Sequence, residues 1–136
     1  MKRERTDAIV LCCTDTGPEM DWSLKQVDLQ SRSRGWFRCV CHFVIKRDGE
    51  IEHGPRHYTE PAMALGRDNA VSVAVCLVGG KGEPPFTRPQ LASLKDLLAE
   101  LQDEYPDAVI KYHHEIDPKV AHHGLDLVAL GKDLCV

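Results

Sequence analysis

The stretch that decides the fold is Val71-Ser-Val-Ala-Val-Cys-Leu77, followed directly by Val78-Gly79-Gly80. It is almost entirely β-branched or small and apolar, which is typical of a strand covered on both faces. The glycines and the pair Pro84-Pro85 mark the exit from this strand. A membrane helix needs roughly 20 residues, about twice this length. We therefore expect the central strand of a buried sheet and no membrane span.

Further strands are indicated on both sides of this stretch. Apolar runs at residues 7–13 and 108–112 each predict one short strand. The runs at 40–46 and 51–53 predict a hairpin, because Asp48-Gly49 between them suits the positive φ values of a tight turn.

Two helices are expected between these strands. Residues 21–33 carry apolar side chains at imperfect helical spacing, and Gly35 ends the segment. Thr87 and Gln90 form a capping box that starts the second helix. Leucines then follow at steps of three and four, at Leu91, Leu94, Leu98 and Leu101. Residues 54–69 show no period and predict a loop, one that could line a site.

The element order predicts a single α/β domain over residues 1–136, with a mixed central β-sheet flanked by helices. The net charge is −4 and the basic residues are scattered, which argues against nucleic-acid binding. The charged N-terminus lacks the apolar run of a secretory signal, so we expect a cytoplasmic protein. Its six cysteines are then expected to be reduced thiols.

Several stretches, taken together and in order, resemble the N-acetylmuramoyl-L-alanine amidase (type 2) family, which includes the T7-type phage lysozymes and the peptidoglycan recognition proteins. The resemblance runs from about residue 5 to residue 127. The matching stretches are Thr6-Asp7-Ala8-Ile9-Val10, Gly35-Trp36, His42-Phe43-Val44-Ile45-Lys46-Arg47-Asp48-Gly49, Cys76-Leu77-Val78-Gly79-Gly80, Phe86-Thr87 with Gln90, and His113-His114-Glu115 with Pro118-Lys119.

The resemblance implies a zinc hydrolase that cuts the amide between N-acetylmuramic acid and L-alanine. Family members hold zinc with a His ending the first strand, a His ending the last strand and a Cys or Asp in the loop that follows. A tyrosine and a lysine assist the oxyanion of the reaction. A phage endolysin of this kind reaches the cell wall after the host membrane is permeabilised. The expected partner is a peptidoglycan fragment or a protein, bound by a monomer.

The residues at these positions are largely substituted. By the resemblance, Cys12, followed by Cys13, stands at the first-strand ligand position, and His113 stands at the last-strand position. The assisting lysine matches as Lys119. The position of the tyrosine is occupied by Cys41.

The third ligand position depends on the alignment of one loop. Direct counting places Ala121 there, whereas a one-residue shift places His122 or His123 there. A substrate-side His of the family corresponds to Ala64, and the Trp-His pair of the first helix corresponds to Gln30-Ser31. These two changes look like losses of substrate contacts.

Two interpretations of the metal site remain open. In the first, Cys12, His113 and His122 replace the family set and still offer one thiolate and two imidazoles, an ordinary donor set for zinc. In the second the site has decayed, and its cysteines are small buried hydrophobes. The cysteines concerned are Cys12, Cys13, Cys39 and Cys41.

Hydrolysis is a stronger claim than metal binding. Loss of one oxyanion donor lowers the rate by about 100- to 1000-fold, and a thiol at Cys41 is a poorer donor than a tyrosine hydroxyl. We expect reduced or altered amidase activity. The alternative is an inactive homologue that binds peptidoglycan or inhibits a phage RNA polymerase. A cysteine nucleophile with His113 or His114 as its base is a third, less supported hypothesis.

Overall fold

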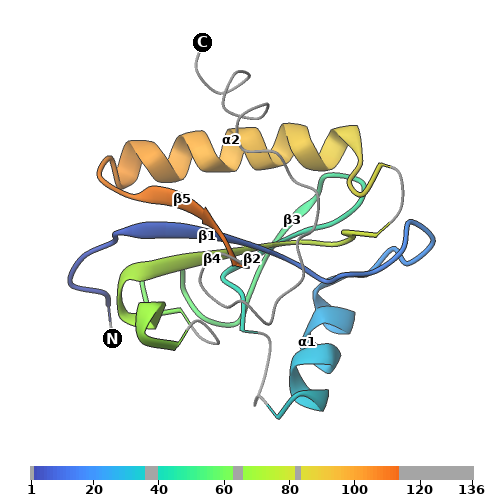
Figure 1. The fold of residues 1–136 in the computed structure, drawn as a ribbon, viewed down its shortest axis with the longest axis horizontal. Helices are drawn as coiled ribbons and strands as arrows, with labels where there is room; N and C mark the ends of the chain where they lie inside the picture. Colours follow the sequence, from blue (N-terminus) through green and yellow to red (C-terminus); the bar gives the residue numbers. More distant parts are fainter. Residues whose placement is uncertain (1, 36–39, 63–65, 82–83, 114–136) are drawn as a thin grey trace.

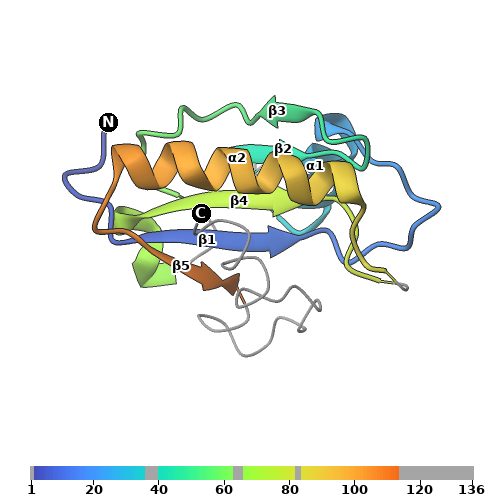
Figure 2. The ribbon, with the colours of Figure 1, turned by 90° about the horizontal axis from the view of Figure 1, so that it is seen from above.

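The computed structural model describes residues 2–35, 40–62, 66–81 and 84–113. Its centre is a five-stranded sheet with the strand order β3-β2-β4-β1-β5. The strands are β1 (Ala8–Cys13), β2 (Phe43–Ile45), β3 (Ile51–His53), β4 (Ser72–Leu77) and β5 (Val109–Tyr112). Figures 1 and 2 show the sheet from two directions.

β4 lies in the middle of the sheet, as the apolar stretch predicted. All six of its residues are buried. It runs parallel to both of its neighbours, β1 and β2, whereas the edge strand β3 is antiparallel to β2. β5 extends the other edge, parallel to β1. The expected mixed sheet is therefore confirmed.

The first hairpin strand is shorter than the sequence predicted, whereas β3 covers the predicted residues 51–53. β2 covers only residues 43–45 of the expected 40–46, because the chain bends at His42 before the ladder begins. Gly49 adopts φ of +92° in the turn to β3, as the Asp-Gly pair predicted. The following segment was expected to be a loop throughout, but its last part belongs to a 3₁₀ helix, η1 (Gly66–Val71).

The longer helix, α2 (Arg88–Glu104), begins as the capping box predicted. Thr87 is its N-cap and accepts a hydrogen bond from the backbone N–H of Gln90. Leu94, Leu98 and Leu101 are buried as expected, whereas Leu91 is only partly buried. Leu97, which the sequence analysis did not include, is buried in its place.

The shorter helix, α1 (Leu24–Ser33), starts three residues later than expected, since the prediction began at Asp21. The reason is local: Ser23 and Gln26 form a capping box that starts the helix after Ser23. α2 covers one face of the sheet, and α1 and η1 lie on the opposite side (Figure 1). In the described part of the chain, no helix is both long enough and apolar enough to span a membrane.

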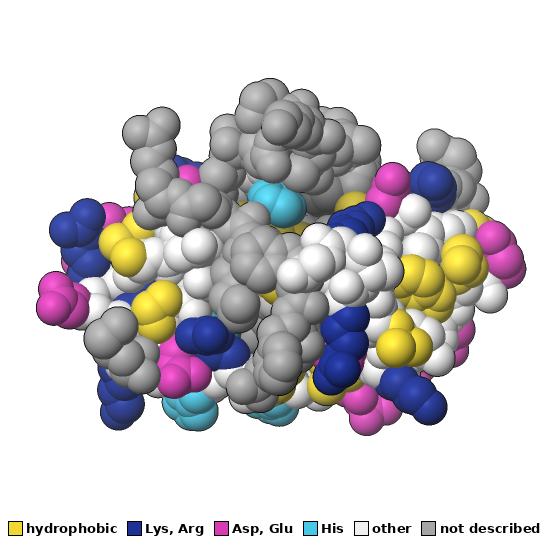
Figure 3. Space-filling view, turned by 90° about the horizontal axis from the view of Figure 1, so that it is seen from below, with side chains coloured by type: hydrophobic (Ala, Val, Ile, Leu, Met, Phe, Trp, Pro, Cys, Tyr) yellow, Lys and Arg dark blue, Asp and Glu magenta, His cyan; other side chains and the backbone are white. Residues whose placement is uncertain are grey.

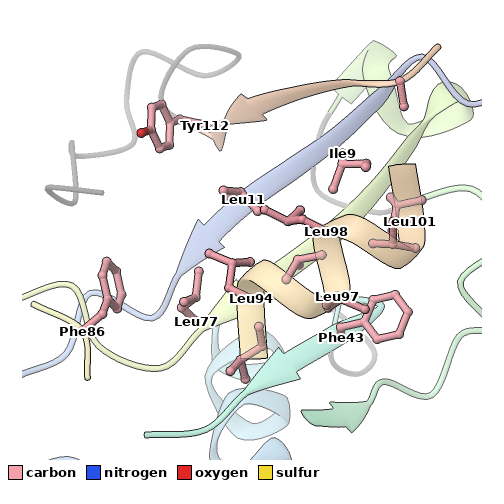
Figure 4. Close-up of a cluster of buried hydrophobic side chains, with 14 residues drawn as sticks. Ile9, Leu11, Phe43, Leu77, Phe86, Leu94, Leu97, Leu98, Leu101 and Tyr112 are labelled. Carbon is pink, nitrogen blue, oxygen red and sulfur yellow. The ribbon is translucent and has the colours of Figure 1, made fainter. Parts of the chain in front are cut away.

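The main core lies between α2 and the sheet (Figure 4). Alternate residues of the strands point into it, and leucines of α2 fill the space between them. The labelled members of this cluster are Ile9, Leu11, Phe43, Leu77, Phe86, Leu94, Leu97, Leu98, Leu101 and Tyr112. The other face of the sheet carries smaller residues in two separate clusters, which contain Cys76 and Ala74 respectively.

Candidate functional site

The ends of β1 and β5 bring together the two candidate ligands that the structure describes. In the parallel pairing of these strands, Leu11 is the partner of Tyr112. Cys12 and His113 follow these two residues directly in the sequence. Both therefore stand near the carboxyl ends of two neighbouring strands. Both are half-buried, and the Nε2 atom of His113 is buried. A thiol and an imidazole therefore lie at the carboxyl ends of two neighbouring strands.

Cys12 packs on the face of the sheet that lies opposite α2, in a cluster with Ala8, Val10 and Ala62. Its register partner on β4 is Cys76, which is almost fully buried. Sequence analysis did not assign Cys76 to the site. The alternation of residues along β4 predicts that Cys76 lies on the same face as Ala74. Its pairing with Cys12 depends on the register of β1 against β4, which the sequence does not reveal.

Cys13 lies on the other side of the sheet, against the α2 core. Burial raises the pKa of its thiol to about 11. A thiol with this pKa is almost entirely protonated at neutral pH and is therefore a poor nucleophile. Its place on the α2 side of the sheet also separates Cys13 from Cys12, which packs on the opposite face.

Cys41, at the tyrosine position, is 6% exposed, and its side chain shares a hydrogen bond with that of Cys76. It packs with Val27 and Val44. The expectation of a small buried hydrophobe is correct for Cys41, whereas Cys12 and Cys13 are only half-buried. Cys39 lies outside the described residues.

Thr14, at the end of β1, is a buried positioning residue that sequence analysis missed. Its hydroxyl accepts a 2.9 Å hydrogen bond from the backbone N–H of Gly79 and lies 2.6 Å from the hydroxyl of Thr16. Gly79 has φ of +136°, which favours glycine. These contacts tie the exit of β1 to the exit of β4 and hold the end of the strand that carries Cys12.

His42 is a second residue to which the sequence analysis assigned no role. Its side chain is buried, with 1% exposed. Its Nδ1 accepts a 2.9 Å hydrogen bond from the N–H of Ala74, so Nε2 carries the proton and donates to the carbonyl of Glu60 at 3.0 Å. Burial, reinforced by the charge of Arg3, lowers its pKa to about 4. His42 is thus a neutral structural group that connects β4 to the loop after β3.

Helix α1 carries Gln30 and Ser31 at the positions of the family's Trp-His pair. Ser31 is buried rather than presented to solvent. The neighbouring Gln30 donates a 3.4 Å hydrogen bond from its side chain to the carbonyl of Thr14. These residues therefore connect α1 to the sheet. Ala64 lies outside the described residues.

Two clefts lined by described residues lie beside the hairpin. One, of about 550 Å³, lies between α1 and β3 and includes Asp28, Arg32, Glu52 and His53 among its lining residues. The other, of about 530 Å³, is lined by Lys2, Pro55, His57, Thr59 and Glu60. Neither is lined by Cys12, Cys41 or His113. We assign the site from its donor atoms, because residues 114–136, which continue from β5, lie outside the described part.

Figure 3 views the face opposite α2, where lysine and arginine side chains are spread out among other residue types. Within the described residues, no group of three or more His, Cys, Asp or Glu side chains is arranged to hold a metal ion. The predicted positions Lys119, Ala121, His122 and His123 all lie beyond residue 113 and outside the described residues. Two of the three predicted metal ligands, Cys12 and His113, can therefore be placed.

The fold is a single α/β domain with a five-stranded mixed sheet, and Cys12 and His113 stand at the carboxyl ends of two neighbouring strands. The chain belongs to the N-acetylmuramoyl-L-alanine amidase family, whose model matches residues 2–129. It is 38% identical over 123 residues to the endolysin of Escherichia phage T7, an alignment covering 87% of this chain and 81% of that protein. It is 35% identical over 122 residues to the endolysin of Enterobacteria phage T3, covering 86% and 80%.

Solved structures confirm the fold. The amidase LysC from Clostridium intestinale superposes with a TM-score of 0.82 at 22% identity, covering 97% of this chain and 87% of that one. The Drosophila peptidoglycan recognition protein SD superposes with a TM-score of 0.73 at 16% identity, covering 95% and 83%. The predicted amidase and peptidoglycan recognition protein-like fold is therefore correct.

Proposed function

We propose that this chain binds zinc through a substituted ligand set, in which Cys12 replaces the family's first histidine. The observation that supports the proposal is the register of β1 and β5, which brings Cys12 and His113 to the same edge of the sheet. His122, in the loop that follows, would complete the set. One thiolate and two imidazoles are an ordinary donor set for zinc, so the residues fit the metal.

Bound zinc would supply Lewis-acid activation of a water molecule and of the substrate carbonyl. The chain's own residues have separate tasks. Thr14 and Gly79 hold the end of β1, so that Cys12 keeps its position relative to β5. Lys119 would stabilise the negative charge that develops on the amide oxygen.

Cobalt(II) tests the metal proposal, because it occupies zinc sites and shows a charge-transfer absorption band when a thiolate binds it. We expect this band in the unaltered protein and its loss in Cys12→Ser. Cys13→Ser is the matched control, since this neighbouring thiol lies on the α2 side of the sheet and should leave the band unchanged. A band of equal intensity in Cys12→Ser would contradict the role of Cys12.

The third ligand needs its own comparison. His122→Ala and His123→Ala, measured separately, should differ, with the larger loss of metal affinity in His122→Ala. An unchanged affinity in both variants would leave Ala121 at the ligand position and would overturn a three-residue site. His57→Ala is a suitable control, because this exposed histidine lies in the loop after β3.

We further propose that the reaction is hydrolysis of the N-acetylmuramoyl-L-alanine amide, at a rate below that of relatives with a tyrosine at position 41. The Cys41 side chain is buried and hydrogen-bonded to that of Cys76, so its thiol is poorly suited to donate to a developing oxyanion. Restoring a donor at this position should recover up to about 100-fold in rate.

Release of peptides with N-terminal L-alanine from purified peptidoglycan measures this activity. We expect slow release by the unaltered protein, faster release by Cys41→Tyr and no release by Lys119→Ala. Cys41→Phe is the control, because a phenylalanine side chain has nearly the volume of tyrosine but lacks the hydroxyl. This variant should not gain activity. Equal rates for Cys41→Tyr and Cys41→Phe would contradict the oxyanion argument.

A binding protein without catalysis is the second candidate, and the packing of Cys41 against Cys76 favours it. Co-sedimentation with insoluble peptidoglycan distinguishes the two. Sedimentation without any peptide release at high protein concentration would support binding alone. Absence of both would direct attention to a protein partner.

A further inference from the structure

Three thiols lie side by side on the sheet face opposite α2. Cys12 and Cys76 are register partners on β1 and β4. Cys41 and Cys76 belong to one buried cluster, together with Val27, Val44 and Val78. All four described cysteines, including Cys13 on the other face, are thiols and not disulfides. Cys76 is therefore the central thiol, with a candidate partner on each side.

Cys41 is the better placed of these two partners. Its side chain already shares a hydrogen bond with that of Cys76, whereas Cys12 packs in a different cluster with Ala8 and Val10. Cys41 also lies just before β2 and so outside its ladder. Disulfide geometry is specific, so a residue outside a ladder can adjust more easily than Cys12, which is held in the ladder of β1 with β4.

We propose that Cys41 and Cys76 form a redox-active thiol pair, which a peroxide converts into a disulfide that connects β4 to the chain just before β2. Hydrogen peroxide first oxidises the Cys41 thiol to a sulfenic acid and releases one water molecule. The Cys76 thiol, whose pKa is raised above its ordinary value by the hydrogen bond with Cys41 and by burial, loses its proton as its sulfur attacks the sulfenyl sulfur, the S–S bond forms, and a second water leaves. This second step is therefore slow at neutral pH and becomes faster as the pH rises. Both thiol protons and both oxygens of the peroxide end in water, and an external thiol reverses the oxidation.

Burial determines which reagents reach this pair. Cys41 is 6% exposed and Cys76 is 3% exposed, so only a small oxidant reaches them without unfolding. Cys12, which is half-buried, is open to larger reagents. Oxidation of the Cys41–Cys76 pair does not depend on zinc. Cys12 remains a thiol when the pair is oxidised. This inference therefore stands or falls independently of the proposed metal site.

Differential alkylation of all six cysteines tests the proposal. The folded protein is treated with stoichiometric hydrogen peroxide, denatured and alkylated with a light reagent, then reduced and alkylated with a heavy one. Mass spectrometry should find the heavy label on Cys41 and Cys76 in a 1:1 ratio and the light label on Cys12. A non-reduced digest should contain the linked peptides. The absence of heavy label, or a link from Cys76 to any other cysteine, overturns the proposal.

Single variants make the test specific. Cys76→Ser should abolish the heavy label on Cys41, and Cys41→Ser should abolish it on Cys76. Cys12→Ser is the matched control and should leave the 1:1 label intact. If Cys76→Ser does not fold, Cys76→Ala carries the same expectation, and Cys41→Ser alone still decides the partner. Persistent heavy label on Cys41 without Cys76 would show that Cys41 pairs elsewhere.

Discussion

The side-chain amide of Gln90 donates a 2.6 Å hydrogen bond to the carbonyl oxygen of Val78 at the exit of β4. The same amide donates to the carbonyl of Ile45 at 3.1 Å, and its oxygen accepts from the N–H of Thr87 at 3.0 Å. Gln90 is completely buried. One side chain thus joins the start of α2 to the ends of two neighbouring strands.

Replacing Gln90 by methionine should lower the free energy of unfolding by about 2–4 kcal/mol, because buried backbone groups then lose their partners. Urea denaturation at pH 7.5 measures the change. Gln102→Met is the control on the same helix, at a half-exposed position, and should change stability by about 0.5 kcal/mol or less. Equal effects of the two variants would show that the buried amide adds no stability.

His42 should make the stability of the fold depend on pH. Its folded-state pKa of about 4 lies below the ordinary 6.5, so the unfolded chain binds the proton more readily. The contribution is complete above about pH 6.5 and is lost as the pH falls towards 4. Between pH 7.5 and 5 we expect His42 alone to account for a loss of about 2 kcal/mol in the free energy of unfolding.

Urea denaturation of the unaltered protein and His42→Gln at both pH values isolates this contribution. The variant lacks the titrating ring, so its stability should fall by about 2 kcal/mol less over the same interval. His57→Gln, at an exposed position, should follow the unaltered protein. Parallel pH curves for His42→Gln and the unaltered protein would contradict the buried, neutral state of His42.

Gly49→Ala should destabilise the hairpin through backbone strain and through a steric clash of the added Cβ atom. Gly49 has φ of +92°, and a Cβ atom there would lie 2.8 Å from the carbonyl oxygen of Pro89. Gly35 has a similar φ of +94°, but a Cβ atom there would meet nothing within 4 Å among the described atoms. Backbone strain alone, about 1–2 kcal/mol, is expected for Gly35→Ala, and a larger loss for Gly49→Ala. Thermal denaturation of both variants measures the difference, and equal losses would exclude a steric effect of Pro89.

Arg3 fastens the N-terminal segment to the loop after β3. Its guanidinium donates to the carbonyls of Tyr58 and Glu60 and lies 5.4 Å from the ring centre of Tyr105. Arg3→Ala should lower the free energy of unfolding by about 1–3 kcal/mol, because two carbonyls lose a charged donor. Arg3→Lys should recover little of this, since an ammonium group lacks the planar fork of donors.

Arg5→Ala is the control for Arg3, because its 3.0 Å ion pair with Asp7 is exposed to solvent. We expect a change of about 0.5 kcal/mol or less. Chemical denaturation in low and moderate salt compares the variants. If Arg3→Ala is as mild as Arg5→Ala, the N-terminal segment contributes little to the fold.

Much of the fold follows from local sequence. The apolar stretch that ends at Leu77 predicted the central strand, because alternate residues on both faces are apolar and only a covered strand buries them all. The Thr87 and Gln90 pair predicted the start of α2, and Asp48-Gly49 predicted the turn. Each of these signals depends on residues within a few positions of one another. The order of the elements predicted a mixed sheet flanked by helices, and the resemblance to the amidase family, now confirmed, agrees with that arrangement.

Contacts between distant residues were decided by the tertiary structure. The sequence marked Cys12, Cys41 and His113 as candidates, but it contained no sign that Cys76 would lie between Cys12 and Cys41. That placement arises from the register of β1 against β4 and from the bend before β2. The burial of His42 likewise depends on Glu60 and Ala74, which lie 18 and 32 positions away in the chain. The sequence by itself determined which elements form, because their signals are local. Which thiols and histidines meet was decided by strand register and packing, because these bring together parts of the chain that carry no local record of each other.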